Sequence, residues 1–249
     1  MKILFFIPAH ENNKVLENCI ENIQQYIVDP IIYIHANATW QDFDSNITNK
    51  YKNVFILPIR FHFVKWTSMI HIIEYAFYKS LPVEYDYFSI FHTNCLFIKT
   101  GLEEYIKDID VTFYEFPNNA SHPNAARCIQ HSDLLNFIPI TEVYNNLAEG
   151  NVYKKDIFLK MITFLRQKTP ELMLNPNTGE ECSLATTSRM FSEPNKRKAP
   201  YLFWNSTGIT IEDINNNLKE NNIFCLKGIP RDMDNPVRKY INDYNNFKR

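Results

Sequence analysis

Runs of consecutive apolar residues alternate with helix-like periodicity along the first half of the chain. A strand buried on both faces is apolar at successive positions, whereas an amphipathic helix places its apolar residues three and four positions apart. These patterns predict five strands, at residues 2–9, 30–37, 53–59, 85–91 and 111–116. They also predict helices at residues 12–27, 68–81 and 102–109. Such alternation is typical of a largely parallel sheet with helices on both faces.

The second half of the chain has a different pattern. Helical spacing predicts three further helices, at residues 152–168, 180–191 and 210–222. After residue 152 we find a strand signal only in the segment YLFW, residues 201–204. No repeat or low-complexity linker divides the chain. We therefore expect a single domain, residues 1–249, in which an α/β part, residues 1–150, precedes a helical part, residues 151–249.

Three polar segments follow predicted strands. They are Pro8–His10, His35–Asn37 and His92–Asn94. In open α/β sheets, ligands bind in the crevice beyond the carboxyl ends of the strands. The strand assignments therefore place these three segments at one crevice, which is where we expect the functional site.

Composition narrows the class of protein. The chain is 45% hydrophobic and 22% charged, which predicts a globular core. Its formal net charge of -2 provides no bulk attraction to nucleic acid or anionic lipid, so we expect no nucleic-acid partner. The apolar run at the N-terminus is too short to span a membrane and has no signal-peptide cleavage site. The five cysteines form no CxxC pair, and we expect reduced thiols that mostly pack in the core.

Several common chemistries have no motif in this chain. No GxGxxG follows the first strand, and neither a P-loop nor a GxSxG elbow occurs. The histidines and cysteines do not fall at zinc-site spacing. A DxD triplet at a strand end would hold a divalent metal against a nucleotide-sugar diphosphate, but no acid follows the fourth strand. The DxD triplets that do occur, which we expect in loops or at helix ends, are Asp42–Asp44, Asp108–Asp110 and Asp232–Asp234.

Two adjacent acids, Glu180 and Glu181, open the predicted helix at residues 180–191. Thr178 and Glu181 have the spacing of a capping box, and acids in a first turn complement the helix dipole. Capping would explain both glutamates, and it would stabilise the helix by about 1 kcal/mol. Alternatively, a carboxylate held at the crevice within reach of a hydroxyl would act as a general base. Spacing alone leaves both interpretations open.

Several segments, taken in order, resemble the core-2/I-branching N-acetylglucosaminyltransferase and xylosyltransferase family. The resemblance spans nearly the whole chain at low identity, and the ordered set of segments carries it. The segments are ILFFIPAHENN, YIHAN, VKWTSMIHIIEYAFYKSL, YDYFSIFHTNCLFIKTGLEEYI, EGNVYKKDI, EECSLAT and IFCLKG.

This resemblance implies a GT-A-like, Rossmann-like fold and a metal-independent reaction that inverts the anomeric centre. It matches Glu181 to the catalytic base, which takes a proton from the acceptor hydroxyl. It matches Lys227 to a cation that stabilises the leaving diphosphate, which is a large electrostatic effect in catalysis. Glu149 and Gly150 match a segment near the acceptor. The positions matched to the nucleotide-sugar site are His10, Asn37, Trp66, Asn94, Lys227 and Arg231.

The chain also departs from the family pattern. Asn37 and Cys95 stand where the family has aspartates. The family has a second basic group upstream of the lysine, and the segment FWNSTGITIED contains neither Arg nor Lys. Lys196, Arg197 and Lys198 lie just before this segment, and Arg231 lies just after Lys227.

The resemblance thus implies a glycosyltransferase that uses a nucleotide sugar, with UDP as the expected nucleotide, and needs no cofactor. The expected acceptor is a saccharide or a glycolipid, such as a growing surface glycan. We expect a cytoplasmic location, and peripheral contact with the inner face of a membrane is left open. Two alternatives remain: a carbohydrate- or nucleotide-binding protein on the same fold without catalysis, and a metal-dependent transferase that uses one of the DxD triplets. The sequence does not address the oligomeric state.

Overall fold

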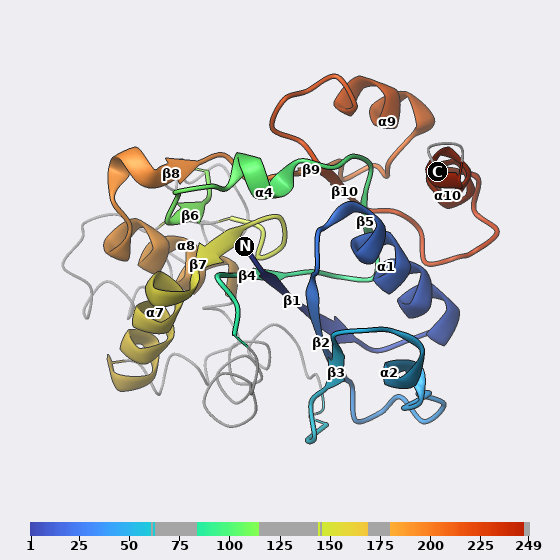
Figure 1. The fold of residues 1–249 in the computed structure, drawn as a ribbon, viewed down its shortest axis with the longest axis horizontal. Helices are drawn as coiled ribbons and strands as arrows, with labels where there is room; N and C mark the ends of the chain where they lie inside the picture. Colours follow the sequence, from blue (N-terminus) through green and yellow to red (C-terminus); the bar gives the residue numbers. More distant parts are fainter. Residues whose placement is uncertain (61, 63–83, 115–143, 145, 169–179, 247–249) are drawn as a thin grey trace.

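A computed structural model describes most of the chain (Figure 1). The described residues are 1–60, 62, 84–114, 144, 146–168 and 180–246. The predicted helix at residues 68–81 and the predicted donor-site residue Trp66 lie outside these ranges.

A seven-stranded sheet forms the centre of the molecule, with strand order β3-β2-β1-β4-β7-β6-β8. Its strands are β1 (Ile3–Ala9), β2 (Ile31–Ala36), β3 (Val54–Ile56), β4 (Tyr87–Ile90), β6 (Val111–Thr112), β7 (Val152–Lys154) and β8 (Arg197–Lys198). Four of the six strand pairs are parallel, and only the two pairs made by β7 are antiparallel. The prediction of a mostly parallel sheet flanked by helices is therefore confirmed.

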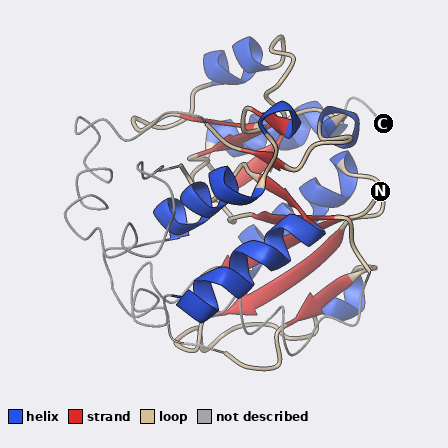
Figure 2. Ribbon diagram, turned by 90° about the vertical axis from the view of Figure 1, so that its left-hand side faces the viewer, coloured by secondary structure: helices blue, strands red, loops and turns tan. Residues whose placement is uncertain are grey.

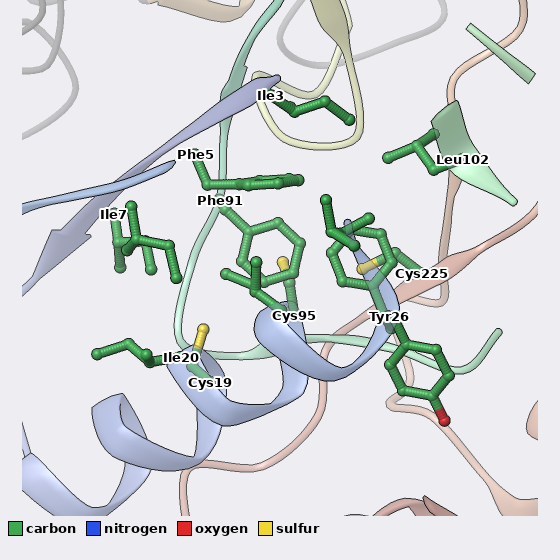
Figure 3. Packing of buried hydrophobic residues seen from close by; sticks show 14 of the residues in the cluster. Ile3, Phe5, Ile7, Cys19, Ile20, Tyr26, Phe91, Cys95, Leu102 and Cys225 are labelled. Carbon is green, nitrogen blue, oxygen red and sulfur yellow. The ribbon is translucent and has the colours of Figure 1, made fainter. Parts of the chain in front are cut away.

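One face of the central sheet packs against α1 (Asn13–Tyr26). Alternate residues of β1, namely Ile3, Phe5 and Ile7, point to this face and form one buried cluster with the apolar side of the helix. Figure 3 shows Cys19 and Ile20 on the side of α1 that faces these strand residues. Since the intervening residues of β1 are also buried, the strand is apolar at successive positions, as its sequence predicts.

The other face of the central sheet packs against α7 (Lys155–Lys168) and α8 (Glu180–Phe191). Figure 2 shows helices lying across the strands in this layered arrangement. The bounds of α8 match the predicted helix. The predicted helix at 152–168 begins three residues later than expected, because residues 152–154 form β7. These residues pair with β4, so a long-range ladder overrides the local helical pattern there.

A smaller sheet with strand order β5-β10-β9 lies beside the first. It contains β5 (Cys95–Phe97), β9 (Leu202–Trp204) and β10 (Cys225–Lys227). One of its faces joins the α1 side of the core, and the other packs under α9 (Ile211–Asn217) and α10 (Pro236–Asn246). Only β9 coincides with a predicted strand. The C-terminal part contains α7, α8, α9 and α10, and it also contains the short strands β7, β8 and β10, which no strand prediction covers.

The short helices and one unpredicted helix complete the fold. The short ones are α2 (Ile47–Lys50), α4 (Leu102–Tyr105) and the 3-10 helix η2 (Pro194–Lys196). Thr210 caps α9 in a reciprocal capping box with Asp213. The structure also contains α10, which no prediction covers. An Asn–Pro pair starts this helix, and the Asn235 side chain accepts a hydrogen bond from the Val237 N–H at 2.9 Å.

The four described cysteines, Cys19, Cys95, Cys182 and Cys225, are free thiols and all are buried. Three of them, Cys19, Cys95 and Cys225, belong to the cluster under α1 (Figure 3). Burial raises the pKa of the Cys225 thiol well above its ordinary value, so this group stays protonated and packs as a small apolar side chain. The predicted packing role fits these positions, while Cys128 lies outside the described residues.

Candidate functional site

Polar residues from the carboxyl ends of several strands lie close together at the position of the predicted crevice. His10 follows β1, and the segment His92–Asn94 connects β4 to β5. The smaller sheet contributes Lys227, the last residue of β10. The Asn94 carbonyl accepts hydrogen bonds from the backbone N–H groups of Gly228 at 3.1 Å and Ile229 at 3.0 Å. These bonds fix the chain after β10 against the end of the main sheet, so Lys227 reaches the crevice from a second sheet.

A buried carboxylate lies at the centre of this site. Glu149 is 3% exposed, and each of its two oxygens contacts a different basic side chain. Oε2 accepts a hydrogen bond from Lys227 Nζ at 2.6 Å, and Oε1 lies 2.6 Å from His92 Nδ1. We call these three residues the Glu149 triad. Short, charge-assisted contacts of this kind fix the orientation of all three side chains.

The electrostatics of the triad keep its acid and its lysine charged. Burial by itself would raise the pKa of Glu149, but the charges and hydrogen bonds of His92 and Lys227 outweigh it and hold that pKa well below its usual range. Burial by itself would lower the pKa of Lys227, but Glu149, followed by Cys95 and more weakly by Glu181, raises it. Glu149 therefore carries a full negative charge near neutral pH, and Lys227 carries a full positive charge.

The backbone explains how Glu149 reaches this position. The residue pairs with Ile90 in an isolated parallel bridge at the end of β4. Gly150 follows with a φ of +80°, which L side chains rarely adopt. A Cβ on Gly150 would lie 2.3 Å from the Cβ of Leu202, so this position has no room for a side chain. Glycine here lets the chain turn tightly from the triad into β7.

A second group of charges lies beside the triad. Arg231 Nε lies 2.6 Å from Glu11 Oε1 and donates a hydrogen bond to Thr93 Oγ1 at 3.1 Å. His10 Nε2 lies 3.4 Å from the same carboxylate oxygen of Glu11. Partial burial lowers the pKa of His10, Glu11 raises it, and the positive charges of Arg231 and His92 lower it further. His10, Arg231 and His92 therefore influence one another across the crevice.

A fully buried arginine holds the segment His92–Asn94, which connects β4 to β5, in place. Arg238 of α10 is 0% exposed, and within the described residues its guanidinium donates to uncharged oxygens. Its acceptors are Pro230 O at 2.9 Å, Thr93 O at 2.9 Å and Asn18 Oδ1 at 2.6 Å. One side chain thus links α10, α1 and the loop that carries His92. It also adds a fixed positive charge below the crevice.

Glu181 lies in the first turn of α8 and is half-buried. Its carbonyl accepts a hydrogen bond from the Asn146 N–H at 3.3 Å, which ties the start of α8 to the segment before Glu149. The negative charge of Glu181 contributes to the raised pKa of Lys227, so the two side chains lie within electrostatic range of each other. Thr178, the partner in the predicted capping box, lies outside the described residues.

The other predicted site residues have distinct surroundings. Asn94 is half-buried in the segment that connects β4 to β5. Asn37 is buried at the end of β2, where its Oδ1 accepts hydrogen bonds from the N–H and the hydroxyl of Thr39, both at 3.1 Å. The Asn37 side chain thus forms a local turn, although its N–H also bonds to Ala9 O at the neighbouring strand end. The structure brings together His10, Asn94, Glu149, Glu181, Lys227 and Arg231.

Two residues at this site escaped the site predictions. His92 belongs to a segment expected at the crevice, but its pairing with Glu149 depends on tertiary structure. Trp204 is 45% exposed at the end of β9, where it is the register partner of Lys227 on the adjacent parallel strand. Neighbours in register project to the same face of a sheet. In the sequence, the only indication of this exposed tryptophan beside Lys227 is that Trp204 ends the predicted strand YLFW.

The three DxD triplets form local contacts. Asp42 O accepts from Asn13 Nδ2, and Asp44 Oδ1 accepts from Asn46 N. Asp232 Oδ1 accepts from the Asp234 N–H. Asp110 is 4% exposed and accepts from Glu193 N, so it is buried rather than part of a solvated loop. In the part of the chain that the structure describes, no group of three or more His, Cys, Asp or Glu residues could hold a metal ion.

Comparisons with known proteins address the fold. No protein-family model matches the chain, and no curated protein matches it. The crystal structure of S. aureus TarS, residues 1–349, is similar to this structure, with a TM-score of 0.50 and 9% sequence identity. TarS is a glycosyltransferase of the GT-A type. The similarity covers 91% of this chain and 60% of that one, so this chain spans about 60% of the length of its structural neighbour. Identity this low shows a shared glycosyltransferase-like fold and nothing finer.

Proposed function

We propose that this protein is a glycosyltransferase that moves a sugar from a nucleotide donor, UDP-linked, to a hydroxyl of a saccharide or glycolipid acceptor. The transfer inverts the anomeric centre and needs no metal ion. This proposal includes a relationship to the core-2/I-branching and xylosyltransferase family. The fold shared with TarS supports the general class, and the site residues support the mechanism.

The position of Lys227 is the observation that carries the proposal. Its side chain is 15% exposed, and Glu149 fixes its ammonium at the carboxyl end of β10. A leaving UDP develops negative charge on its diphosphate as the glycosidic bond breaks. A cation that is already oriented stabilises this charge without reorganising during the reaction. Lys227 therefore takes the role that a divalent metal has in other transferases.

Glu181 is the proposed general base. Its half-buried side chain lies within electrostatic range of Lys227, so base and cation are near each other. The acceptor oxygen forms a bond to the anomeric carbon while its proton moves to Glu181 and the bond to the diphosphate breaks. UDP leaves with the electron pair of that bond. A single displacement of this kind inverts the anomeric centre.

Glu149 has a different proposed role from the acceptor contact that the sequence suggested. Both of its oxygens are taken by Lys227 and His92, and only 4% of its side chain is exposed. We therefore propose Glu149 as a positioning residue that holds Lys227, with Gly150 allowing the turn that places it. His10, Asn37, Trp66, Asn94 and Arg231 remain proposed donor-site residues.

A substitution of Glu181 tests the mechanism. Gln satisfies a capping box as well as Glu does, so Glu181→Gln preserves the capping function while it removes the base. We expect turnover to fall by about 10²-fold or more and donor affinity to change little. The assay measures UDP released from UDP-glucose, UDP-galactose, UDP-N-acetylglucosamine or UDP-xylose with saccharide acceptors. Wild-type turnover in the folded variant would reject Glu181 as the base.

Two controls complete this experiment. Glu212→Gln removes an exposed glutamate from the first turn of α9 and should leave turnover unchanged. Assays with EDTA separate the proposed reaction from a metal-dependent one, because full activity in the chelator excludes a required divalent metal.

A nucleotide- or saccharide-binding protein without catalysis is the second candidate. One observation favours it: Glu149 cancels the charge of Lys227 and so weakens the field available to a leaving diphosphate. A ligand that binds only the folded form raises the melting temperature, so a thermal-shift screen of UDP-sugars detects binding under either function. A binding protein would show such shifts without UDP release under any acceptor condition.

A further inference from the structure

The charges within the Glu149 triad do not by themselves favour an anionic ligand. Glu149 contributes one negative charge and Lys227 one positive charge, and their contact at 2.6 Å makes a neutral pair. The third member, His92, therefore decides the net charge of the triad. The triad is neutral when the imidazole is neutral and carries one positive charge when the imidazole is protonated.

The geometry of His92 fixes which nitrogen can bind a ligand. Nδ1 lies 2.6 Å from Glu149 Oε1, and an ionised carboxylate only accepts hydrogen bonds, so Nδ1 carries a proton and donates it. Nε2 is shielded from solvent and has no hydrogen-bond partner in the described part of the chain. A buried polar atom without a partner is unfavourable, and a ligand group that paired with it would remove this penalty. The imidazole is 22% exposed, so part of the ring is open to solvent.

We propose that protonated His92 is a second cation of the diphosphate site and that its Nε2–H donates a hydrogen bond to a diphosphate oxygen of the donor. The inference deepens the proposed function and rests on it. Neutral His92 would present a lone pair to that oxygen and repel it, whereas protonated His92 presents a donor and a charge. The affinity for the diphosphate should therefore rise as the pH falls.

The charged and titratable groups around His92 come from every element that meets at the crevice. They are Glu149 before β7, Lys227 at the end of β10, Arg231 after β10, Arg238 in α10, His10 and Glu11 after β1, Cys95 in β5 and Cys19 in α1. Glu149 stays ionised and Lys227 stays protonated between pH 5 and 8, because both have pKa values displaced away from this range.

Calorimetric titration with UDP tests the inference at about pH 5.5 and about pH 8. His92→Asn keeps a donor where Nδ1 stands and removes Nε2, while His92→Gln keeps a neutral donor near Nε2. Both variants should bind UDP roughly 10-fold more weakly than wild type at the lower pH, and within about twofold of wild type at the higher pH. The terminal phosphate of UDP also titrates near pH 6, but it does so equally with every variant. All proteins in this comparison, the reference included, carry His10→Asn, because His92 influences the pKa of His10. The ratio of variant to wild-type affinity therefore isolates His92.

The controls separate failure of this inference from failure of the proposed function. His62→Asn removes an exposed imidazole that follows β3 and should leave binding unchanged at both pH values. If either folded His92 variant matches wild type at the lower pH, or is weakened equally at both, the inference is wrong while UDP binding still supports the function. If the folded wild-type chain does not bind UDP at all, the proposed function is wrong and the inference fails with it. Binding to uridine should not depend on pH in any variant, since uridine has no phosphate.

Discussion

Replacing Glu149 with Gln should destabilise the protein far more than an ordinary charge substitution does. The carboxylate is 4% exposed and Lys227 is 15% exposed, so solvent cannot replace the lost partner. The introduced glutamine would keep the shape of the side chain and a hydrogen-bonding oxygen. It would leave the partly buried ammonium of Lys227 without a counter-charge, and its single oxygen would have to serve both Lys227 and His92. The perturbation is therefore almost purely electrostatic.

The magnitude follows from the burial of the pair. Removing one partner of a buried ion pair costs about 3–5 kcal/mol, because an uncompensated charge remains in a poorly solvated place. An exposed ion pair contributes about 0–1 kcal/mol. A change of 1 kcal/mol shifts the melting temperature of a chain of this size by about 2–4 °C, so we expect Glu149→Gln to lower the melting temperature by about 10 °C.

Guanidinium denaturation followed by circular dichroism measures the free energy of unfolding for a double-mutant cycle. The cycle uses Glu149→Gln, Lys227→Met and the double variant. Because the double variant leaves no buried charge unpaired, it should be more stable than the sum of the two single effects predicts, by about 2 kcal/mol or more. Glu84→Gln provides the matched control, since Glu84 also pairs with a lysine, Lys155, at 2.8 Å but is 93% exposed.

The control substitution should change stability little. If Glu149→Gln also changes the free energy of unfolding by less than about 1 kcal/mol, the triad is solvated in solution. Its proposed role in orienting Lys227 would then be refuted. Additive effects in the cycle would lead to the same conclusion, because they would mean that Glu149 and Lys227 do not interact.

Three further predictions concern the same region. Because the pKa of Glu149 is lowered in the folded chain, its ionised carboxylate stabilises the fold above the unfolded pKa of about 4.3. The stability difference between wild type and Glu149→Gln should therefore shrink as the pH falls below that value. Denaturation at a series of pH values measures this difference. Gly150→Ala should cost about 2–4 kcal/mol by thermal unfolding, because of its positive φ and the Cβ of Leu202 at 2.3 Å. Trp204→Ala should leave the melting temperature nearly unchanged, since the ring is 45% exposed, but should weaken ligand binding by about 1–3 kcal/mol if a base stacks on it, measured by calorimetry. Exposed Ile211 is its control, and Ile211→Ala should change neither quantity.

The main sheet could be predicted because its long strands have a local signature. All residues of β1 and β2 are buried, and this burial on two faces gives an apolar run that is unbroken in β1 and interrupted by His35 in β2. The start of α8 was equally clear from its acids and its apolar spacing. The predicted strand at 111–116 shortens to two residues, Val111–Thr112, within the part of that segment that the structure describes.

Short strands left no such signature. β8 contains two residues, and β5 and β10 contain three each, so none is long enough to show a period. They are strands because partners distant in sequence lie beside them: β10, near the C-terminus, pairs with β5 from the first half of the chain. A pairing between segments so far apart is a property of the folded chain, and local propensity cannot encode it.

The same division applies to the site. Strand topology was enough to place His10 and the segment His92–Asn94 at one crevice. The partner of Lys227 was not predictable, because Glu149 lies 78 residues before it and the contact depends on where the second sheet docks. The sequence resemblance therefore placed Glu149 near the acceptor, whereas in the folded chain its carboxylate contacts Lys227 and His92.

This docking explains why the proposed site depends on the C-terminal helix. β10 carries Lys227 to the crevice, and the chain after it is held by bonds to Asn94 and by Arg238 from α10. The buried guanidinium donates to three uncharged oxygens, and burial is the largest influence on its pKa, which it lowers, so this anchor opposes folding. The same positive charge would stabilise a diphosphate in the crevice above it. Because the charge of Arg238 opposes folding and favours an anionic ligand, a diphosphate ligand should raise the melting temperature of wild type more than that of Arg238→Met.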